Sequence, residues 1–163
     1  MRRAPQEIRT YFVTAVTAQR RRIFQVAANA ELLQSTLLDY HGQGRFLLHG
    51  FVIMPDHFHA ILTPASEVSL EKAMQFIKGG FSFRLKSTLD VWMRSFNESQ
   101  ILTEEKFWNG VLYIEENPVR SGLAAAPANW PYSSAVQGRP NSMPAHLQTK
   151  GPGLKARKFE PEP

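Results

Sequence analysis

The chain has 163 residues, of which 43% are hydrophobic, and it carries a formal net charge of +5 at pH 7. This length and composition fit one globular domain with a hydrophobic core and argue against disorder over most of the chain. The sequence has no cysteine and no apolar run near the ~18 residues of a membrane span, so we expect no disulfide framework, thiolate nucleophile, secretory signal or membrane segment.

The positive charge favours a polyanionic partner, with nucleic acid ahead of an anionic membrane. Charge alone leaves this open, because many basic proteins bind no polyanion. A cytoplasmic protein is the default expectation, associated with the nucleoid if the source is bacterial.

The first half of the chain predicts a strand, a helix and a hairpin. Residues 8–17 are rich in β-branched and aromatic side chains and predict a strand that breaks near residue 19. Apolar residues then recur at three- and four-residue steps up to Tyr40, which predicts a helix with Asn29 as its N-cap and Gly42 and Gly44 at its end. Residues 45–63 predict two strands that turn near 54–56.

The second half predicts two helices around a strand. Residues 69–87 form the clearest helical pattern, with Ser69 as N-cap. Its Gly79-Gly80 pair costs about 1 kcal/mol per glycine relative to alanine, which suggests a close backbone approach to a strand or a phosphodiester. Residues 91–101 predict a strand. Thr103 can cap a last helix, and we expect that helix to end near Asn117, because a proline follows.

These elements alternate as β, α, β, β, α, β, α. Such an order, without repeated βαβ units, predicts an α+β fold with a central antiparallel sheet and helices packed on it. We expect one domain over residues 1–137. Residues 138–163 are polar and basic and predict a poorly ordered tail.

Two histidines in "MPDHFHAIL", residues 54–62, are candidate metal ligands. Residues two apart on a strand point to the same face, roughly 6.6–7 Å apart, so His57 and His59 project together while Phe58 points to the opposite face. Two imidazoles on one face can bind one divalent ion. The same spacing also fits two histidines at the edge of a core, and the pair alone leaves both readings open.

The segment "LYIEENP", residues 112–118, holds a candidate nucleophile. On a helix, Tyr113 and Asn117 lie four residues apart on one face, about 5–6 Å between Cβ atoms. A phenol beside a carboxamide oxygen could combine a nucleophile with a ligand for a hard metal ion. A tyrosine whose ring is packed in the core and an asparagine at a helix end would give the same sequence. Spacing alone cannot show that Tyr113 and Asn117 lie near the histidines.

Several separate segments together carry a family resemblance. "MPDHFHAILTP", "FIKGGFSFRLKS", "VWMRSF" and "YIEENPVRSGLAAAPANWPYSS" follow one another in the order and spacing of a known family. Over roughly residues 8–135 the chain resembles the REP-associated tyrosine transposases, which are relatives of the single-tyrosine HUH transposases that act on single-stranded DNA. The resemblance implies an HUH fold with a ferredoxin-like, RRM-like core.

The resemblance also implies roles for individual residues. His57 and His59 would ligate Mg²⁺ or Mn²⁺, and Asn117 would supply a third metal-ligating side chain. Tyr113 would attack a DNA phosphodiester and give a 5′-phosphotyrosine link and a free 3′-hydroxyl. The implied substrate is single-stranded, hairpin-forming repeat DNA. A monomer is favoured over a homodimer that exchanges the tyrosine helix.

Basic and polar residues flank the proposed site and are candidate phosphate contacts. A solvated protein surface explains them equally well from the sequence. They are Arg20, Arg21, Arg22, Lys78, Ser82, Arg84, Lys86, Arg94 and Arg120.

The sequence therefore predicts a metal-dependent single-stranded-DNA endonuclease and strand transferase. The main alternative is a domesticated protein that binds hairpin DNA and has lost turnover. A metallohydrolase that uses the histidine pair without a covalent step would instead require Asp or Glu ligands beside a third histidine, and the sequence suggests no such cluster.

Overall fold

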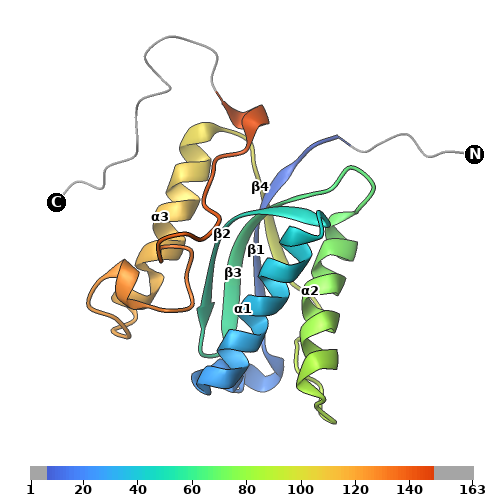
Figure 1. The fold of residues 1–163 in the computed structure, drawn as a ribbon, viewed down its shortest axis with the longest axis vertical. Helices are drawn as coiled ribbons and strands as arrows, with labels where there is room; N and C mark the ends of the chain where they lie inside the picture. Colours follow the sequence, from blue (N-terminus) through green and yellow to red (C-terminus); the bar gives the residue numbers. More distant parts are fainter. Residues whose placement is uncertain (1–6, 149–163) are drawn as a thin grey trace, which may run out of the picture.

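A four-stranded antiparallel sheet with strand order β2-β3-β1-β4 forms the centre of the computed structural model, which describes residues 7–148 (Figure 1). This is the α+β fold that the sequence predicts. The strands are β1 (Thr10–Val16), β2 (Phe46–Met54), β3 (His57–Pro64) and β4 (Asn97–Ile101). The longer helices are α1 (Ala27–Gly42), α2 (Leu70–Leu85) and α3 (Glu104–Arg120). None of the helices within residues 7–148 is long and apolar enough to cross a membrane.

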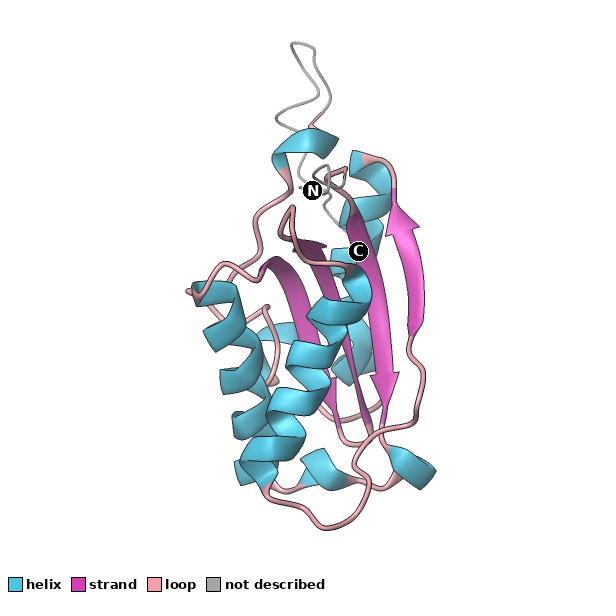
Figure 2. Ribbon diagram, turned by 90° about the vertical axis from the view of Figure 1, so that its right-hand side faces the viewer, coloured by secondary structure: helices cyan, strands magenta, loops and turns pink. Residues whose placement is uncertain are grey.

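The helices cover both faces of the sheet. Helices α1 and α2 lie side by side on one face, and α3 packs on the other, so the sheet is the middle layer (Figure 1, and turned by 90° in Figure 2). Strand β3 divides its side chains between the two layers. Phe58 is buried with α1 and α2, whereas Ile61 is buried with α3. Because side chains alternate along a strand, His57 and His59 share the α3 face with Ile61.

The predicted hairpin is confirmed, and it fixes the register of the histidines. Strand β3 pairs with β2 on one side, with Val52 opposite His59. On the other side β3 pairs with β1, with Thr14 opposite His59. Each histidine therefore sits between two neighbouring strands, where its backbone is held on both sides.

The predicted helix caps are right in α2 and α3 and wrong in α1. The hydroxyls of Ser69 and Thr103 each accept a hydrogen bond from the backbone N–H three residues on, as N-caps do. Asn29, by contrast, lies inside α1, which begins at Ala27 without a side-chain cap. Its amide instead donates to the carbonyl of Ile23 and ties α1 to the turn before it.

The end of α3 also differs from the prediction. The helix does not stop near Asn117 but continues through Pro118 to Arg120. Pro118 cannot donate a backbone hydrogen bond, but it is buried and lies in the last turn, where only one helical bond is lost. The carbonyls of Asn117 and Pro118 are bonded by the N–H groups of Ser121 and Leu123. The extra turn keeps Arg120 on the helix.

The strand predicted over residues 91–101 is half as long as expected. Only Asn97–Ile101 forms β4. Before it, Trp92 makes a single bridge to Thr17, and its ring packs between Phe24 and Phe58. Two backbone hydrogen bonds, from Ala18 N–H to the Val91 carbonyl and from Met93 N–H to the Val16 carbonyl, hold this segment together with the packing of the indole.

The segment predicted as a tail differs from the prediction over residues 138–148, whereas residues 149–163 lie outside the described residues. A short 3₁₀ helix, Ala145–Leu147, buries Leu147 in the core beneath α3. The carbonyl of Ser142 accepts a hydrogen bond from His49 Nδ1 at 2.8 Å. One buried leucine and one buried histidine thus attach a polar segment that has little hydrophobic pattern of its own.

The Gly79-Gly80 pair makes room for an aromatic ring. A Cβ atom at Gly80 would lie 2.9 Å from the ring of Tyr40 on α1, whereas a Cβ at Gly79 would meet nothing within 4 Å. Tyr40 is held there by stacking on Phe76, with ring centroids 5.2 Å apart. The close approach is therefore to a side chain of the neighbouring helix, not to a strand.

This difference predicts opposite effects for two adjacent substitutions. We expect Gly79→Ala to raise the free energy of unfolding by about 1 kcal/mol, because alanine is the better helix former and has free space. Gly80→Ala should lose that gain, because the new methyl group displaces Tyr40. Urea unfolding of both variants measures the difference, and equal stabilisation would contradict the assigned contact.

The buried His49 predicts a loss of stability in acid. Burial lowers the pKa of His49 to about 4, while its Nδ1 bonds the Ser142 carbonyl and its Nε2 accepts from the Thr63 hydroxyl. The folded protein then binds this proton less readily than the unfolded chain, whose histidine pKa is about 6.5. The contribution of His49 is complete above pH 6.5 and is lost as the pH falls from 6.5 towards 4.

We therefore expect His49→Gln to flatten the pH dependence of stability. Between pH 7.5 and 4.5, the parent protein should lose about 2–3 kcal/mol more than the variant in urea unfolding. The variant is expected to be less stable at pH 7.5, so the comparison rests on the slope. Parallel curves for the two proteins would show that His49 does not titrate in this way.

Candidate active site

The two histidines lie together on β3, as the sequence predicts. The ring centroids of His57 and His59 are 4.9 Å apart and their planes are inclined by 76°. His59 is buried, whereas the side chain of His57 is 21% exposed. The pair thus occupies the border between the core under α3 and the solvent.

One nitrogen of each ring is engaged by a neighbouring polar group. His57 Nδ1 lies 2.6 Å from a carboxylate oxygen of Asp56, and His59 Nδ1 lies 2.7 Å from the hydroxyl oxygen of Thr14. In the tautomer protonated at Nδ1, each ring donates through Nδ1 and keeps the lone pair of Nε2 available. Histidines that bind metals are oriented in this way by their second nitrogen.

Burial and nearby charges favour the neutral form of His59 and the ionised form of Asp56. Burial, reinforced by the positive charges of His57 and Arg120, lowers the pKa of His59 to about 3. For Asp56, burial raises the pKa, but the hydrogen bond and charge of His57 together with Arg20 outweigh it and lower the pKa overall. At neutral pH the site therefore offers an unprotonated imidazole at His59 and a carboxylate that can orient His57.

Tyr113 on α3 meets the histidines of its own chain. Its ring centroid lies 5.4 Å from that of His59 and 5.9 Å from that of Phe12, both in edge-to-face geometry. The side chain is 46% exposed, so solvent and large substrates can reach it. The two patterns that sequence spacing could not join are brought into contact by the packing of α3 on the sheet.

A glycine permits this close packing. A Cβ atom at Gly110 would lie 3.1 Å from Ile61 and 3.4 Å from the ring of Phe12, which is tighter than ordinary contact. The buried side chains of Val111 and Ile114 anchor the adjoining turns of α3 in the same core. Gly110 thus sets the distance at which α3, and with it Tyr113, lies from β3.

Asn117 lies one turn beyond Tyr113 on the same helix. Gly110 lies beside Ile61 and Tyr113 beside His59, so α3 advances along β3 towards His57. Four helical residues rise about 6 Å, so Asn117 lies about that far beyond the Tyr113–His59 contact along the axis of α3. The side chain is 8% exposed, and its Oδ1 accepts a hydrogen bond from the Ser121 hydroxyl at 3.4 Å.

The available side chains fit a divalent cation that has two histidine ligands. Within residues 7–148 there is no group of three or more His, Cys, Asp or Glu that could hold a metal ion. A third protein ligand would therefore be of another type, and the carboxamide of Asn117 is a hard oxygen donor that Mg²⁺ and Mn²⁺ accept.

Two of the nine candidate phosphate contacts lie at this site. The guanidinium of Arg120 lies 4.6 Å from the centre of the Tyr113 ring and donates to the Tyr113 carbonyl. Arg20 Nη1 lies 3.5 Å from Asp56 Oδ2. Both arginines are exposed, so each combines a position beside the site with a charge accessible to DNA.

Four other candidates lie on the far side of the sheet. Helix α2 and the residue after it carry them, and α2 packs on the face opposite the histidines. Within the fold, Lys78 bonds the Met93 carbonyl, and Arg84 pairs with Asp39 at 2.9 Å. These four are Lys78, Ser82, Arg84 and Lys86.

The three remaining candidates lie outside both groups. Arg21 bonds the backbone carbonyls of Ala18 and Asp90, whereas Arg22 bonds the side chain of Gln25. Arg94 is exposed. DNA binding by these residues stays a prediction.

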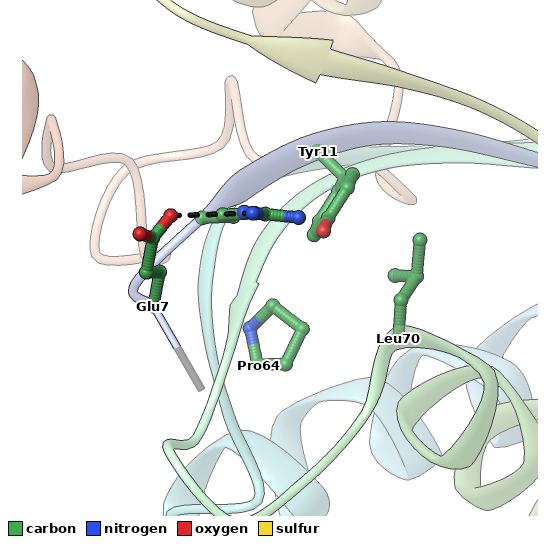
Figure 3. A pocket seen from close by; sticks show the side chains of 5 residues that line it. Glu7, Tyr11, Pro64 and Leu70 are labelled. Carbon is green, nitrogen blue, oxygen red and sulfur yellow. Dashed lines mark hydrogen bonds and ion pairs between the residues drawn. The ribbon is translucent and has the colours of Figure 1, made fainter. Parts of the chain in front are cut away.

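One surface pocket of the described residues lies beside the site and another lies far from it. A groove of about 580 Å³ adjoins Tyr113. A smaller hollow of about 250 Å³ lies at the other end of β1, where Arg9 pairs with Glu7 at 3.2 Å (Figure 3). Tyr11 and Leu70 line the smaller hollow and pack with the core beneath α1 and α2, so it does not open onto the histidines.

Comparison with known proteins identifies the family. The profile of the family described as "Transposase IS200 like" matches residues 8–116, a range that includes both histidines and Tyr113. The chain belongs to this family of IS200-like transposases. Its members' name indicates an enzyme that processes DNA.

Individual relatives agree with this assignment. The chain is 25% identical over 126 residues to a REP-associated tyrosine transposase of Escherichia coli (strain K12), covering 77% of this chain and 75% of that one. A protein of Haemophilus influenzae (strain ATCC 51907 / DSM 11121 / KW20 / Rd), provisionally given the same name, is 27% identical over 96 residues. That alignment covers 50% of this chain and 54% of the relative.

A solved structure shares the fold. A REP-associated tyrosine transposase bound to a REP hairpin matches with a TM-score of 0.70 and 22% identity, covering 91% of this transposase and 93% of that chain. At this identity the match establishes the arrangement of the sheet and helices. It confirms the fold predicted for the IS200-like chain.

Two site residues were missed by sequence reasoning. Asp56 is adjacent to His57 in the sequence, and a hydrogen-bonding partner for the ring could have been suspected from that position. Thr14 gave no local signal, because its contact with His59 depends on the β1–β3 register.

The hydrogen bond between Asp56 and His57 predicts a change in metal affinity. We expect Asp56→Asn to weaken Mn²⁺ binding about 10–100-fold, because the carboxylate no longer orients His57. Electron paramagnetic resonance of free Mn²⁺ measures the affinity without DNA. Glu98→Gln, which removes an exposed carboxylate of β4, is the matched control. Equal affinities in all three proteins would contradict this role of Asp56.

Proposed function

We propose that this transposase is a metal-dependent single-stranded-DNA endonuclease and strand transferase that acts on hairpin-forming repeat DNA. The observation that carries the proposal is the contact between Tyr113 and His59 within one chain. The Tyr113 side chain contacts the His59 ring and is still 46% exposed, so DNA can reach it at this position. The names of the relatives, which include a protein bound to a REP hairpin, support this class of substrate.

In the proposed reaction, the Tyr113 oxygen attacks a DNA phosphorus atom. A phosphotyrosine bond forms, the bond from phosphorus to the 3′ oxygen breaks, and the phenolic proton is balanced by protonation of the leaving 3′ oxygen. One strand end is then linked to the protein through its 5′ phosphate, and the other carries a free 3′-hydroxyl. Attack by the 3′-hydroxyl of a second DNA end reverses the step, joins the strands and releases Tyr113.

The residues around Tyr113 would position the phosphate. His57, His59 and Asn117 would hold a Mg²⁺ or Mn²⁺ ion, which supplies charge neutralisation at a non-bridging phosphate oxygen. Asp56 and Thr14 would keep the two rings oriented through Nδ1. The chain itself thus provides the fixed half of the site on β3 and the nucleophile on α3.

Arg120 would act at the nucleophile. Its guanidinium lies over the Tyr113 ring and remains exposed. A cation in this position attracts the DNA phosphate towards the Tyr113 oxygen.

We further propose that the protein acts as a monomer in the cytoplasm on chromosomal DNA. The support for a monomer is that Tyr113 already meets His59 of the same chain, so no second copy is needed to assemble the site. A homodimer that exchanges α3 would bring together the same residues from two chains. A protein that binds hairpin DNA without cleaving it is the alternative function, and adduct formation separates the two.

A covalent adduct with DNA tests the proposed reaction. We expect the protein, incubated with Mn²⁺ and labelled DNA hairpins that carry single-stranded flanks, to form an adduct that survives a denaturing gel. Tyr113→Phe should abolish the adduct, because the ring remains but the attacking oxygen is gone. Tyr132→Phe, which alters another partly exposed tyrosine, is the control and should retain it.

Removing the histidines tests the metal assignment separately. EDTA and the double substitution His57→Ala/His59→Ala should each reduce adduct formation at least 100-fold, by loss of charge stabilisation at the phosphate. An adduct that forms equally well in Tyr113→Phe would refute the nucleophile. Sensitivity to EDTA without sensitivity to the histidine substitutions would refute the ligands.

A further inference from the structure

An open groove of about 580 Å³ begins at Tyr113 and runs between α3 and β4. It exists because α3 packs mainly on β2 and β3 and leaves residues 97–100 of β4 uncovered. All four residues from Asn97 to Gln100 in β4 are exposed, as expected for an edge strand without a covering helix. The groove is therefore continuous with the proposed catalytic site.

The floor of the groove combines an aromatic ring with a hydroxyl group. Phe12 of β1 is paired directly with Ser99 of β4, so their side chains point to the same face. That face is the one that carries His59, because the ring of Phe12 lies 5.4 Å from the His59 ring. Phe12 is only partly buried, and Ser99 is exposed.

The wall of the groove combines a cation with the proposed nucleophile. Lys106, Gly110 and Tyr113 follow one another at four- and three-residue steps, which places them on one face of α3. Lys106 is exposed at the outer end of the groove and Tyr113 at the inner end, two helical turns apart. Gly110 adds no side chain between them. Leu102, 69% exposed, forms an apolar rim.

We propose that this groove binds one unpaired nucleotide adjacent to the scissile phosphate. Its base stacks on Phe12, its edge bonds Ser99, and its backbone phosphate contacts Lys106. This inference rests on the proposed function, because it places the nucleotide next to Tyr113. It makes Phe12 and Ser99 specificity-determining residues for a single DNA position outside the hairpin.

The chemistry of the lining favours a nucleobase over the sugar-phosphate backbone alone. A groove for phosphates would be lined by several cations, whereas the lining of this one has a single lysine, Lys106, among aromatic, aliphatic and uncharged polar residues. An aromatic platform with a cation at its edge is the common arrangement for holding single-stranded bases. Its position beside the nucleophile limits the occupant to a nucleotide that flanks the cleaved bond.

The proposal can be tested by removing single bases from the DNA flank and measuring binding under conditions in which the DNA is not cleaved. A hairpin with a single-stranded flank is first selected from a pool of random flanks by binding to full-length Tyr113→Phe protein in EDTA. Binding is then measured by fluorescence anisotropy with an abasic site at each flank position in turn. We expect one position at which the abasic site weakens binding roughly 5–150-fold, the usual effect of losing one stacked base.

Two matched substitutions on β4 assign that base to the groove. Ser99→Ile fills the floor with a side chain that suits a strand, and the abasic site should then weaken binding less than twofold further. Glu98→Ile is the control, because Glu98 is paired with Val13 and points to the other face of the sheet. It should leave the full effect of the abasic site in place. Phe12→Leu, checked for folding by thermal unfolding, should act like Ser99→Ile.

The outcomes separate this proposal from the proposed function. An adduct at Tyr113 in the parent protein, combined with no abasic-sensitive flank position or with a sensitivity that Ser99→Ile leaves unchanged, would overturn the groove and leave the reaction intact. A sensitive position that depends on Ser99, without any adduct, would support the groove and refute the reaction. Failure of every flanked hairpin to bind would overturn both.

Discussion

The close packing of α3 against β3 is the constraint on which the site depends. The distance between α3 and the sheet is set where Gly110 passes Ile61 and Phe12, and a side chain at that position would push the helix outward. One turn further along, the same approach brings Tyr113 to the ring of His59. A displacement of about 1 Å at the reacting groups can cost a large factor in rate, so this contact between backbone and side chains matters for the chemistry as well as for stability.

The sheet supplies the complementary half of the site by its register. His59 is flanked by Val52 and Thr14 on neighbouring strands, and the Thr14 hydroxyl holds its Nδ1. His57, at the start of the strand, is held by Asp56 in the hairpin turn. The two rings are thus oriented by different elements, one by strand pairing and the other by a turn. In the tautomer protonated at Nδ1, both rings keep the lone pair of Nε2 available.

Local sequence patterns predicted most elements and the common face of the histidines, because strand alternation and helix periodicity depend on nearby residues. They could not predict that Tyr113 meets His59, because these residues are 54 positions apart in the sequence and their contact depends on how α3 packs on the sheet. Only the family resemblance linked the two residues. They failed at Pro118, where burial of the ring outweighs one lost hydrogen bond, and at Asn29, whose amide bonds a preceding turn instead of a helix end. Charge could not separate Arg120 at the site from Arg84, which pairs with Asp39 on the other face.

In the proposed reaction one chain contributes both halves of a working site, and a mixing experiment distinguishes this arrangement from an exchange of α3 between two chains. Tyr113→Phe protein retains the histidines, and His57→Ala/His59→Ala protein retains the tyrosine. When the two variants are mixed with Mn²⁺ and flanked hairpin DNA, we expect no covalent adduct, because neither chain holds a complete site. Recovery of adduct in the mixture to an appreciable fraction of the parent level would contradict this expectation and would show that α3 is exchanged between subunits.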